Sequence, residues 1–137
     1  MGNRRMRVYI SGPITTGGQD KVPVNLKTGI LTWRELIRRG FAPWCPHMND
    51  IGYIVSEPVS WEDALEVDEE WVDVSDVLLR LPGASKGGDR EERYARDRGI
   101  PVVYSIEELE RLRESMNDSI EELCEDDSIS LFKVLND

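Results

Sequence analysis

The chain has 137 residues, of which 39% are apolar and 32% charged, and its formal net charge is −10. This length is sufficient for one domain that buries a hydrophobic core without metals or disulfides. The negative charge argues against sequence-independent binding to nucleic acids, which depends on a basic surface. The single histidine, His47, leaves no room for a histidine-based zinc site or a Ser-His-Asp triad.

The cysteines and the hydropathy pattern indicate a cytoplasmic protein. Cys45 and Cys124 fit no metal-binding or redox spacing, which indicates a reduced intracellular environment. No apolar run approaches the length of a membrane span, and the first apolar segment is too short for a signal peptide. We therefore expect no metal or other cofactor and no membrane partner.

The first half of the chain contains two strand patterns and one helix pattern. A β-branched and aromatic run, RVYIS, ends at Gly12-Pro13 and predicts a strand followed by a loop. Apolar residues at helical spacing between Asn25, the expected N-cap, and Gly40 predict a helix. In chain order, we expect a strand at 7–11, a loop at 12–23, the helix, a short strand at 41–44 and a long loop at 45–60.

The second half repeats the alternation of helix and strand. Residues 61–74 place Leu65, Asp68 and Trp71 on one side of a helix. The apolar run VLLRL that follows is typical of a buried parallel strand. Such alternation predicts an α/β domain with a parallel sheet and helices on both faces. The further elements are expected as a strand at 77–81, a loop at 82–89, a helix at 90–98 and a strand at 101–104.

The C-terminal part begins with Ser105 of the sequence SIEE, a capping box that predicts another helix. Acidic residues are concentrated at 117–128 and predict a solvated linker. Residues 129–135 are apolar again and predict a tail that packs either on its own domain or on a partner subunit. We expect residues 105–137 to form a helical, acidic extension of an α/β domain at residues 1–104.

The stretch from Asp68 to Ala95 combines the features of a ligand site. It runs from a helix through a buried strand and a polar loop into a second helix, where an open α/β sheet usually binds its ligand. Asp68 interrupts an apolar helix side, and a carboxylate there is costly to bury unless it is paired. It is either a functional carboxylate or one at the rim of the apolar stripe that pairs with an arginine.

Glu91 is the second candidate carboxylate. The free N–H groups and the dipole of a helix start keep a first-turn carboxylate ionised, and an ionised carboxylate can attack a sugar carbon. Acids are also enriched in first turns without any function, and Glu92 is a rival position. Because Glu91 lies four residues before the small residue Ala95, which suits close approach to the sheet, we expect Glu91 to face inward.

The loop before this helix carries Ser85, Gly87 and Gly88. Glycines leave backbone N–H groups accessible, and a hydroxyl before a helix N-terminus can donate to a phosphate or sugar oxygen. The stretch is neither a Walker loop nor a G-x-G-x-x-G fingerprint, so neither ATP nor NAD is predicted. The arginines that follow alternate with acids and predict a solvated helix face.

Three further candidates, Tyr9, Gly12 and Ile14, lie at the end of the first strand, at the edge where an α/β crevice opens. Tyr9 is either part of this site or a core aromatic residue whose hydroxyl found a partner. Together with the loop and the two acids, these residues define one predicted pocket.

The combination resembles the nucleoside 2-deoxyribosyltransferase superfamily, which includes the 2′-deoxynucleoside 5′-monophosphate N-glycosidases. Residues 8–14 (VYISGPI) are similar to the opening of that family, and Asp68-x-x-Trp71 is similar to its aspartate helix. The loop from Ser85 to Glu91 resembles its S-x-G-x-x-x-E motif. The similarity covers about residues 7–104, and in length the chain resembles short stand-alone versions of this domain among bacteriophage proteins.

The resemblance implies a flavodoxin-like fold and a reaction at the N-glycosidic bond of a (deoxy)nucleoside or its 5′-monophosphate. Glu91 would attack C1′ of the sugar or stabilise its oxocarbenium-like transition state. Asp68 would assist proton transfer to the departing base, and Tyr9 would hold Glu91 by a hydrogen bond. The substrate-binding residues would be Gly12 and Ile14 at the sugar and Ser85, with Gly87 and Gly88, at the 5′ end.

The family also implies a partner, because its members usually complete each active site with residues of a neighbouring subunit. We therefore expect a homodimer or a larger homo-oligomer that acts on a small molecule. Pro13 and Thr15 stand where the monophosphate enzymes place a serine and an arginine that grip phosphate. The alternatives to an enzyme are a non-catalytic module that keeps the pocket to bind or sense a nucleotide, and an interaction domain with a vestigial pocket.

Overall fold

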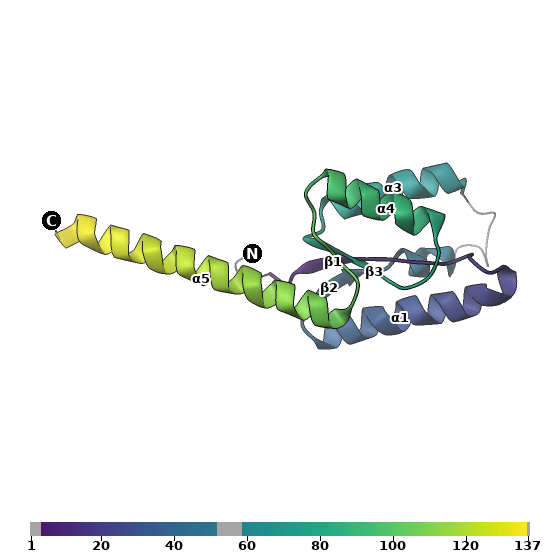
Figure 1. Ribbon diagram of the computed structural model, residues 1–137, viewed down its shortest axis with the longest axis horizontal. Helices are drawn as coiled ribbons and strands as arrows, with labels where there is room; N and C mark the ends of the chain where they lie inside the picture. Colours follow the sequence, from purple (N-terminus) through teal and green to yellow (C-terminus); the bar gives the residue numbers. More distant parts are fainter. Residues whose placement is uncertain (1–3, 52–58, 137) are drawn as a thin grey trace.

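Four parallel strands form the centre of the protein in the computed structural model, which describes residues 4–51 and 59–136 (Figure 1). Their order in the sheet is β2-β1-β3-β4, and each neighbouring pair is parallel. The same order, 2-1-3-4, makes up the first four strands of a flavodoxin-like sheet, so the predicted α/β fold is confirmed. The strands are β1 (Arg7–Ser11), β2 (Ala42–Trp44), β3 (Val77–Arg80) and β4 (Val102–Val103).

Helices cover both faces of the sheet (Figure 1). Helix α1 lies on one face, and α3 and α4 lie side by side on the other. Helix α5 follows β4 and joins α1 on its face with its first turns. The helices are α1 (Val22–Arg38), α3 (Trp61–Asp73), α4 (Lys86–Asp97) and α5 (Ile106–Asn136), and the short 3-10 helices are η1 (Gln19–Lys21) and η2 (Pro46–Ile51).

Alternating side chains of the central strands build two separate cores. Val8 and Ile10 of β1 are fully buried in the larger core, which includes residues of α1 and α5. Tyr9 points to the opposite face, where it packs with Leu78 and with α3 and α4. The second core is the smaller one, and the polar residues of the site lie on this face.

Helix α1, which follows the loop after β1, starts earlier than the sequence predicted. Helix α1 begins at Val22, with Pro23 in its first turn, so the expectation that Asn25 is the N-cap is wrong. The Asn25 side chain instead donates to the carbonyl oxygens of Ile14 at 2.9 Å and Thr16 at 3.2 Å. It therefore ties the loop after β1 to α1. The long loop predicted at 45–60 contains η2, and its residues 52–58 lie outside the described part of the chain.

Helix α4 also begins earlier, at Lys86 rather than at Arg90. The cause is Ser85, whose hydroxyl accepts a hydrogen bond from the N–H of Gly88 at 2.9 Å and caps the helix. The two glycines assigned to the loop therefore belong to the first turn of α4. Glu91 lies in the second turn.

The solvated linker expected at 117–128 is wrong, because α5 continues through it as one helix of 31 residues. This segment contains no glycine or proline to interrupt a helix. The contacts of α5 with the core come from its first turns, and the rest of the helix extends away from the domain (Figure 1). The core contacts involve Ile106, Leu109, Leu112 and Met116.

Within the described residues, no helix has both the length and the hydropathy of a membrane span.

Leu109→Ala is expected to lower the free energy of unfolding by about 2–5 kcal/mol, since it leaves a cavity in the core. Leu109 is fully buried in the larger core. Urea unfolding followed by circular dichroism measures the change. The control Ile120→Ala, further along α5, is expected to cost less than about 1 kcal/mol. Equal losses in both variants would contradict a core that includes only the first turns of α5.

Candidate active site

Glu91 of α4 is buried against the sheet, with 5% of its surface exposed. The hydroxyl of Tyr9 donates a hydrogen bond to its Oε2, and the hydroxyl of Ser11 donates to its Oε1 at 2.8 Å. Both donors lie on the same face of β1 because they are two residues apart. Glu92 is partly exposed and pairs with Arg96 at 3.7 Å, so Glu91 is the inward-facing acid.

Arg80 is a second buried charge at the site, with 8% of its surface exposed. It is the register partner of Ser11 in the adjacent strand and points to the same face of the sheet. Its guanidinium pairs with Asp89 at 3.0 Å and donates to the carbonyls of Leu81 at 3.3 Å and Gly83 at 3.1 Å. Arg80 therefore braces the connection between β3 and α4.

These residues lie where the strand order reverses. Along the chain, β1 is followed by β2 on one side and by β3 on the other. In doubly wound sheets, ligands bind in the crevice at the carboxyl ends of the strands that flank this switch point. Ser11 and Arg80 occupy the carboxyl ends of β1 and β3, and Glu91 reaches the same place from α4.

Asp68 of α3 is partly buried and acts electrostatically on the same phenol as Glu91. Burial raises the pKa of the Tyr9 hydroxyl well above its ordinary value, and the negative charges of Glu91 and then Asp68 raise this pKa further. The phenol therefore keeps its proton and remains a donor to Glu91. The two acids predicted from the sequence thus both act on the pKa of one tyrosine, although only Glu91 is hydrogen-bonded to it.

The helices that carry the two acids are joined by an ion pair next to them. Arg90 of α4 pairs with Glu69 of α3 at 2.6 Å and with Glu62 at 2.9 Å. Because Arg90 and Glu69 are chain neighbours of Glu91 and Asp68, this pair links α3 and α4 beside the site. The expected solvated face of α4 therefore includes ion pairs with α3.

A second set of contacts links the far ends of the same two helices. Asp73 of α3 accepts a hydrogen bond from Tyr94 and pairs with Arg98, both at 2.7 Å.

Burial raises the pKa of Glu91 above its ordinary value. The hydrogen bonds from Tyr9 and Ser11 and the charge of Arg80 act in the opposite direction, because they favour the ionised carboxylate. The expectation that a helix start keeps Glu91 ionised is wrong, because Glu91 lies beyond the first turn of α4. Side chains of β1 and β3 stabilise its ionised form instead.

The glycines of α4 have different neighbours. A Cβ at Gly88 would lie 2.7 Å from Nη1 of Arg80, so the guanidinium occupies the space of a side chain. A Cβ at Gly87 would meet only Leu65, at an ordinary 3.5 Å. Ser85 uses its oxygen as the helix cap, and a hydroxyl that accepts can still donate its own hydrogen. Contact of these residues with a substrate stays a prediction.

Gly12 and Ile14 belong to the loop that leaves β1. A Cβ at Gly12 would lie 2.8 Å from the Cβ of Leu81, so this loop passes closely over the end of β3. Ile14 is partly buried, and its backbone is held by the Asn25 side chain. Gly12 therefore borders the switch point, and contact of either residue with a sugar stays a prediction.

His47 of η2 is fully buried and holds the same loop from the other side. Its Nε2 lies 3.2 Å from the carbonyl oxygen of Pro13, which can only accept, so Nε2 carries the proton. Burial lowers the pKa of His47 and keeps the ring neutral. A Cβ at Gly29 of α1 would lie 2.6 Å from this ring.

Among the described side chains, no group of three or more His, Cys, Asp or Glu residues is placed to hold a metal ion.

Ser11, Arg80, Arg90 and His47 were not among the residues predicted from the sequence. A signal existed for Ser11, which follows Tyr9 by two residues on the same strand. A signal also existed for Arg80, the only cation in the apolar run of β3. The ion pairs of Arg90 and the packing of His47 depend on tertiary structure that no local pattern encodes.

Comparison with known proteins identifies the family of the chain. The model of the family described as "Domain of unknown function (DUF4406)" matches residues 6–104, and the chain belongs to this family. The matched residues include the four strands and all residues of the site described above. A search of curated proteins found no match.

Glu91→Gln is expected to stabilise the fold more at neutral than at acidic pH. Because the pKa of Glu91 is raised in the folded protein, the stability contributed by its protonated form is complete below about 4.5, the pKa of the unfolded residue. This stability is lost as the pH rises through the pKa of the folded state, and glutamine has no such transition. Urea unfolding at acidic and neutral pH measures the difference from wild type.

The control for this experiment is Glu92→Gln, which removes the neighbouring charge at a partly exposed position. Its difference from wild type is expected to change less with pH than that of Glu91→Gln. A stability gain in Glu91→Gln that shrinks as the pH rises would contradict the raised pKa.

Gly88→Ala is expected to destabilise the protein by about 1–3 kcal/mol, since the new methyl group displaces the buried Arg80 guanidinium. Gly87→Ala is the matched control in the same helical turn. It is expected to stabilise by about 0.5–1 kcal/mol, because alanine is the better helix former and its Cβ has room. Urea unfolding measures both changes, and equal effects would show that Arg80 does not occupy this space.

Proposed function

We propose that the protein cleaves or transfers at the N-glycosidic bond of a nucleoside or a nucleoside 5′-monophosphate, with Glu91 as the nucleophile. The observation that carries this proposal is the buried Glu91 carboxylate, held at the β1–β3 switch point by Tyr9 and Ser11. Burying a carboxylate is costly, and groups with perturbed pKa values concentrate at functional sites. The resemblance of residues 7–104 to the nucleoside 2-deoxyribosyltransferases supports the same reaction.

In the proposed reaction, one carboxylate oxygen of Glu91 forms a bond to C1′ of the sugar. The C1′–N bond breaks at the same time, and its electron pair leaves with the base. Water, or a second base in a transferase, then attacks C1′ and releases the carboxylate. Because the ionised carboxylate is the reactive form, base release is expected to increase as the pH rises through the raised pKa of Glu91.

Asp68 is proposed to deliver a proton to the departing base and to orient the sugar. Enzymes that cleave glycosidic bonds through two carboxyl groups use one as the nucleophile and the other at the leaving group. The electrostatic action of both acids on Tyr9 supports this division of roles. So does the ion pair between Arg90 and Glu69, which holds the two helices together beside them.

The 5′ end of the substrate is proposed to lie at the start of α4. The first N–H groups of a helix and its dipole favour a phosphate group. Ser85 contributes a hydroxyl at this position, and Gly87 leaves the backbone without a side chain. These features support a 5′-monophosphate as the substrate.

Release of free base is the direct test. The protein is incubated with a panel of nucleosides and 5′-monophosphates, and the products are separated by chromatography. Glu91→Gln is expected to lower the rate of release by at least about a thousandfold, and Asp68→Asn by about 10²–10⁴-fold.

The matched control is Glu92→Gln, which is expected to keep most of the activity because its side chain pairs with Arg96 at the surface. Tight binding of a nucleotide without any release of base would favour the non-catalytic sensing module instead. Undiminished release by Glu91→Gln would contradict the role of Glu91.

A further inference from the structure

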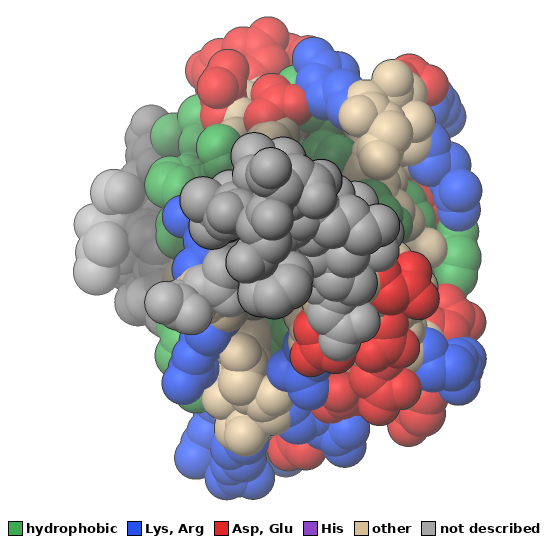
Figure 2. Space-filling view, turned by 90° about the vertical axis from the view of Figure 1, so that its left-hand side faces the viewer, with side chains coloured by type: hydrophobic (Ala, Val, Ile, Leu, Met, Phe, Trp, Pro, Cys, Tyr) green, Lys and Arg blue, Asp and Glu red, His purple; other side chains and the backbone are tan. Residues whose placement is uncertain are grey.

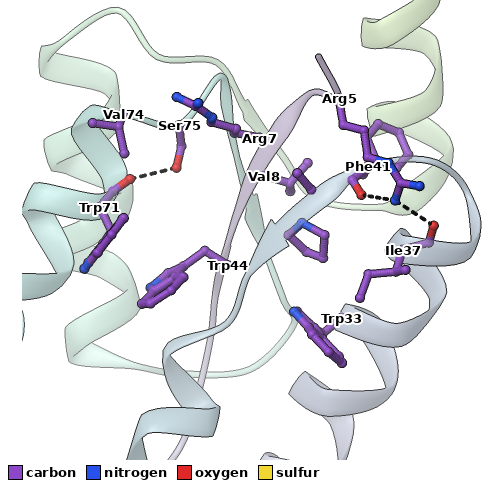
Figure 3. Close-up of a pocket in the computed structure, with 12 residues that line it drawn as sticks. Arg5, Arg7, Val8, Trp33, Ile37, Phe41, Trp44, Trp71, Val74 and Ser75 are labelled. Atoms are coloured by element: carbon purple, nitrogen blue, oxygen red, sulfur yellow. Dashed lines mark hydrogen bonds between the residues drawn. The ribbon is translucent and has the colours of Figure 1, made fainter. Parts of the chain in front are cut away.

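An apolar groove of about 660 Å³ lies along the free edge of β2 (Figure 3). It runs along the whole of β2 and the amino end of β1, whereas the candidate active site lies at the carboxyl ends of β1 and β3. Its lining comes from both faces of the sheet, with α1 on one side of β2 and α3 on the other (Figure 3). We name this surface the edge groove.

The edge groove exposes large apolar side chains. Trp71 stacks on Trp44 with ring centroids 4.4 Å apart, yet 43% of its surface remains exposed. Val74, at the end of α3, is 50% exposed, and Ile37 of α1 is 37% exposed. Contiguous exposed apolar surface of this kind marks interaction sites.

The shape of this edge favours a helix as the occupant. β2 is an edge strand of three residues with Pro43 in its middle. Proline has no N–H group and interrupts pairing with a further strand, so addition of a strand to this edge is disfavoured. An amphipathic helix can instead lay its apolar side into an apolar groove.

The chain itself supplies such a helix next to the groove. Arg113 of α5 lies over the ring of Phe41, a residue of the groove lining, at 4.0 Å. Helix α5 thus leaves the domain beside the groove, and from Met116 to its end it extends for about 30 Å. The sequence of its last turns, ISLFKVL at 129–135, is rich in apolar residues and follows an acidic segment.

We propose that the edge groove binds the C-terminal end of α5 from a second copy of this chain, in a twofold-symmetric dimer. Twofold symmetry lets two α5 helices run antiparallel. The C-terminal tip of each helix (residues 129–135) then lies near the first turns of the other, where the groove opens. The tip of α5 does not reach the groove of its own chain, because the helix extends away from it (Figure 1). The contact is independent of the proposed reaction.

Charge complementarity supports the same partner. Arg5 and Arg7 line the groove. Arg5 donates hydrogen bonds to the carbonyl oxygens of Ile37 and Phe41, and these uncharged acceptors do not neutralise its positive charge. The segment of α5 before its apolar tip is strongly acidic. In the view toward the end of the molecule from which α5 projects, basic and hydrophobic side chains lie next to one another (Figure 2).

The test is the association state of the full chain in sedimentation velocity. The wild type is expected to be a dimer, and Val74→Glu in the groove and Phe132→Glu in the tip are each expected to raise the dissociation constant at least about tenfold. The control Val67→Glu lies on α3, which ends one residue before Val74. Val67 is 54% exposed and lies outside the groove, so this substitution is expected to leave the dimer unchanged.

Mixing the two variants tests whether tip and groove meet. A dimer of one Val74→Glu chain and one Phe132→Glu chain keeps one intact contact and combines both substitutions in the other. The mixture is therefore expected to associate more tightly than either variant alone. A wild type that remains monomeric at about 100 μM, a dimer unaffected by Val74→Glu, or a mixture no tighter than its components would overturn the proposal.

Discussion

Burial of one carboxylate is the constraint on which the rest of the site depends. Removing the charge of Glu91 from water costs several kcal/mol unless hydrogen bonds and an opposite charge compensate for it. Tyr9, Ser11 and Arg80 provide part of this compensation from two adjacent strands, and the pKa of Glu91 remains raised. Arg80 in turn needs the space beside Gly88, and its guanidinium is held by the carbonyl of Gly83 in the preceding loop and by Asp89 of α4. A change at any of these positions is therefore transmitted to the carboxylate.

The two faces of the sheet carry different kinds of side chains. On the face covered by α1 and α5, Val8, Ile10 and Leu79 belong to the larger apolar core. On the face covered by α3 and α4, the same strands present Tyr9, Ser11 and Arg80, and the core is small. The alternation of side chains along a strand thus lets two short strands support the fold and the site together. The edge groove lies along β2 and the amino end of β1, so the proposed association and the proposed chemistry use different parts of the surface.

The sequence predicted the parallel sheet because strand and helix patterns alternate with short connections, and it predicted the inward position of Glu91 from the small residue four positions later. It missed the start of α4, because the capping action of Ser85 competes with two glycines that read as a loop. Arg80 was read as part of a buried strand, which is correct, but its partner Asp89 and its fit against Gly88 arise only from tertiary packing. The acidic segment of α5 was read as a linker because its charge outweighed its helix-forming composition.

The most direct test of the central claim is the titration of the Glu91 carboxyl carbon in the folded protein by nuclear magnetic resonance, with wild type and Tyr9→Phe side by side. Burial raises the pKa of Glu91, and the hydrogen bond from Tyr9 lowers it. The midpoint is therefore expected to lie above that of an ordinary glutamate in the wild type, and higher still in Tyr9→Phe. An ordinary midpoint that does not change when the phenol hydroxyl is removed would contradict a buried carboxylate held by Tyr9.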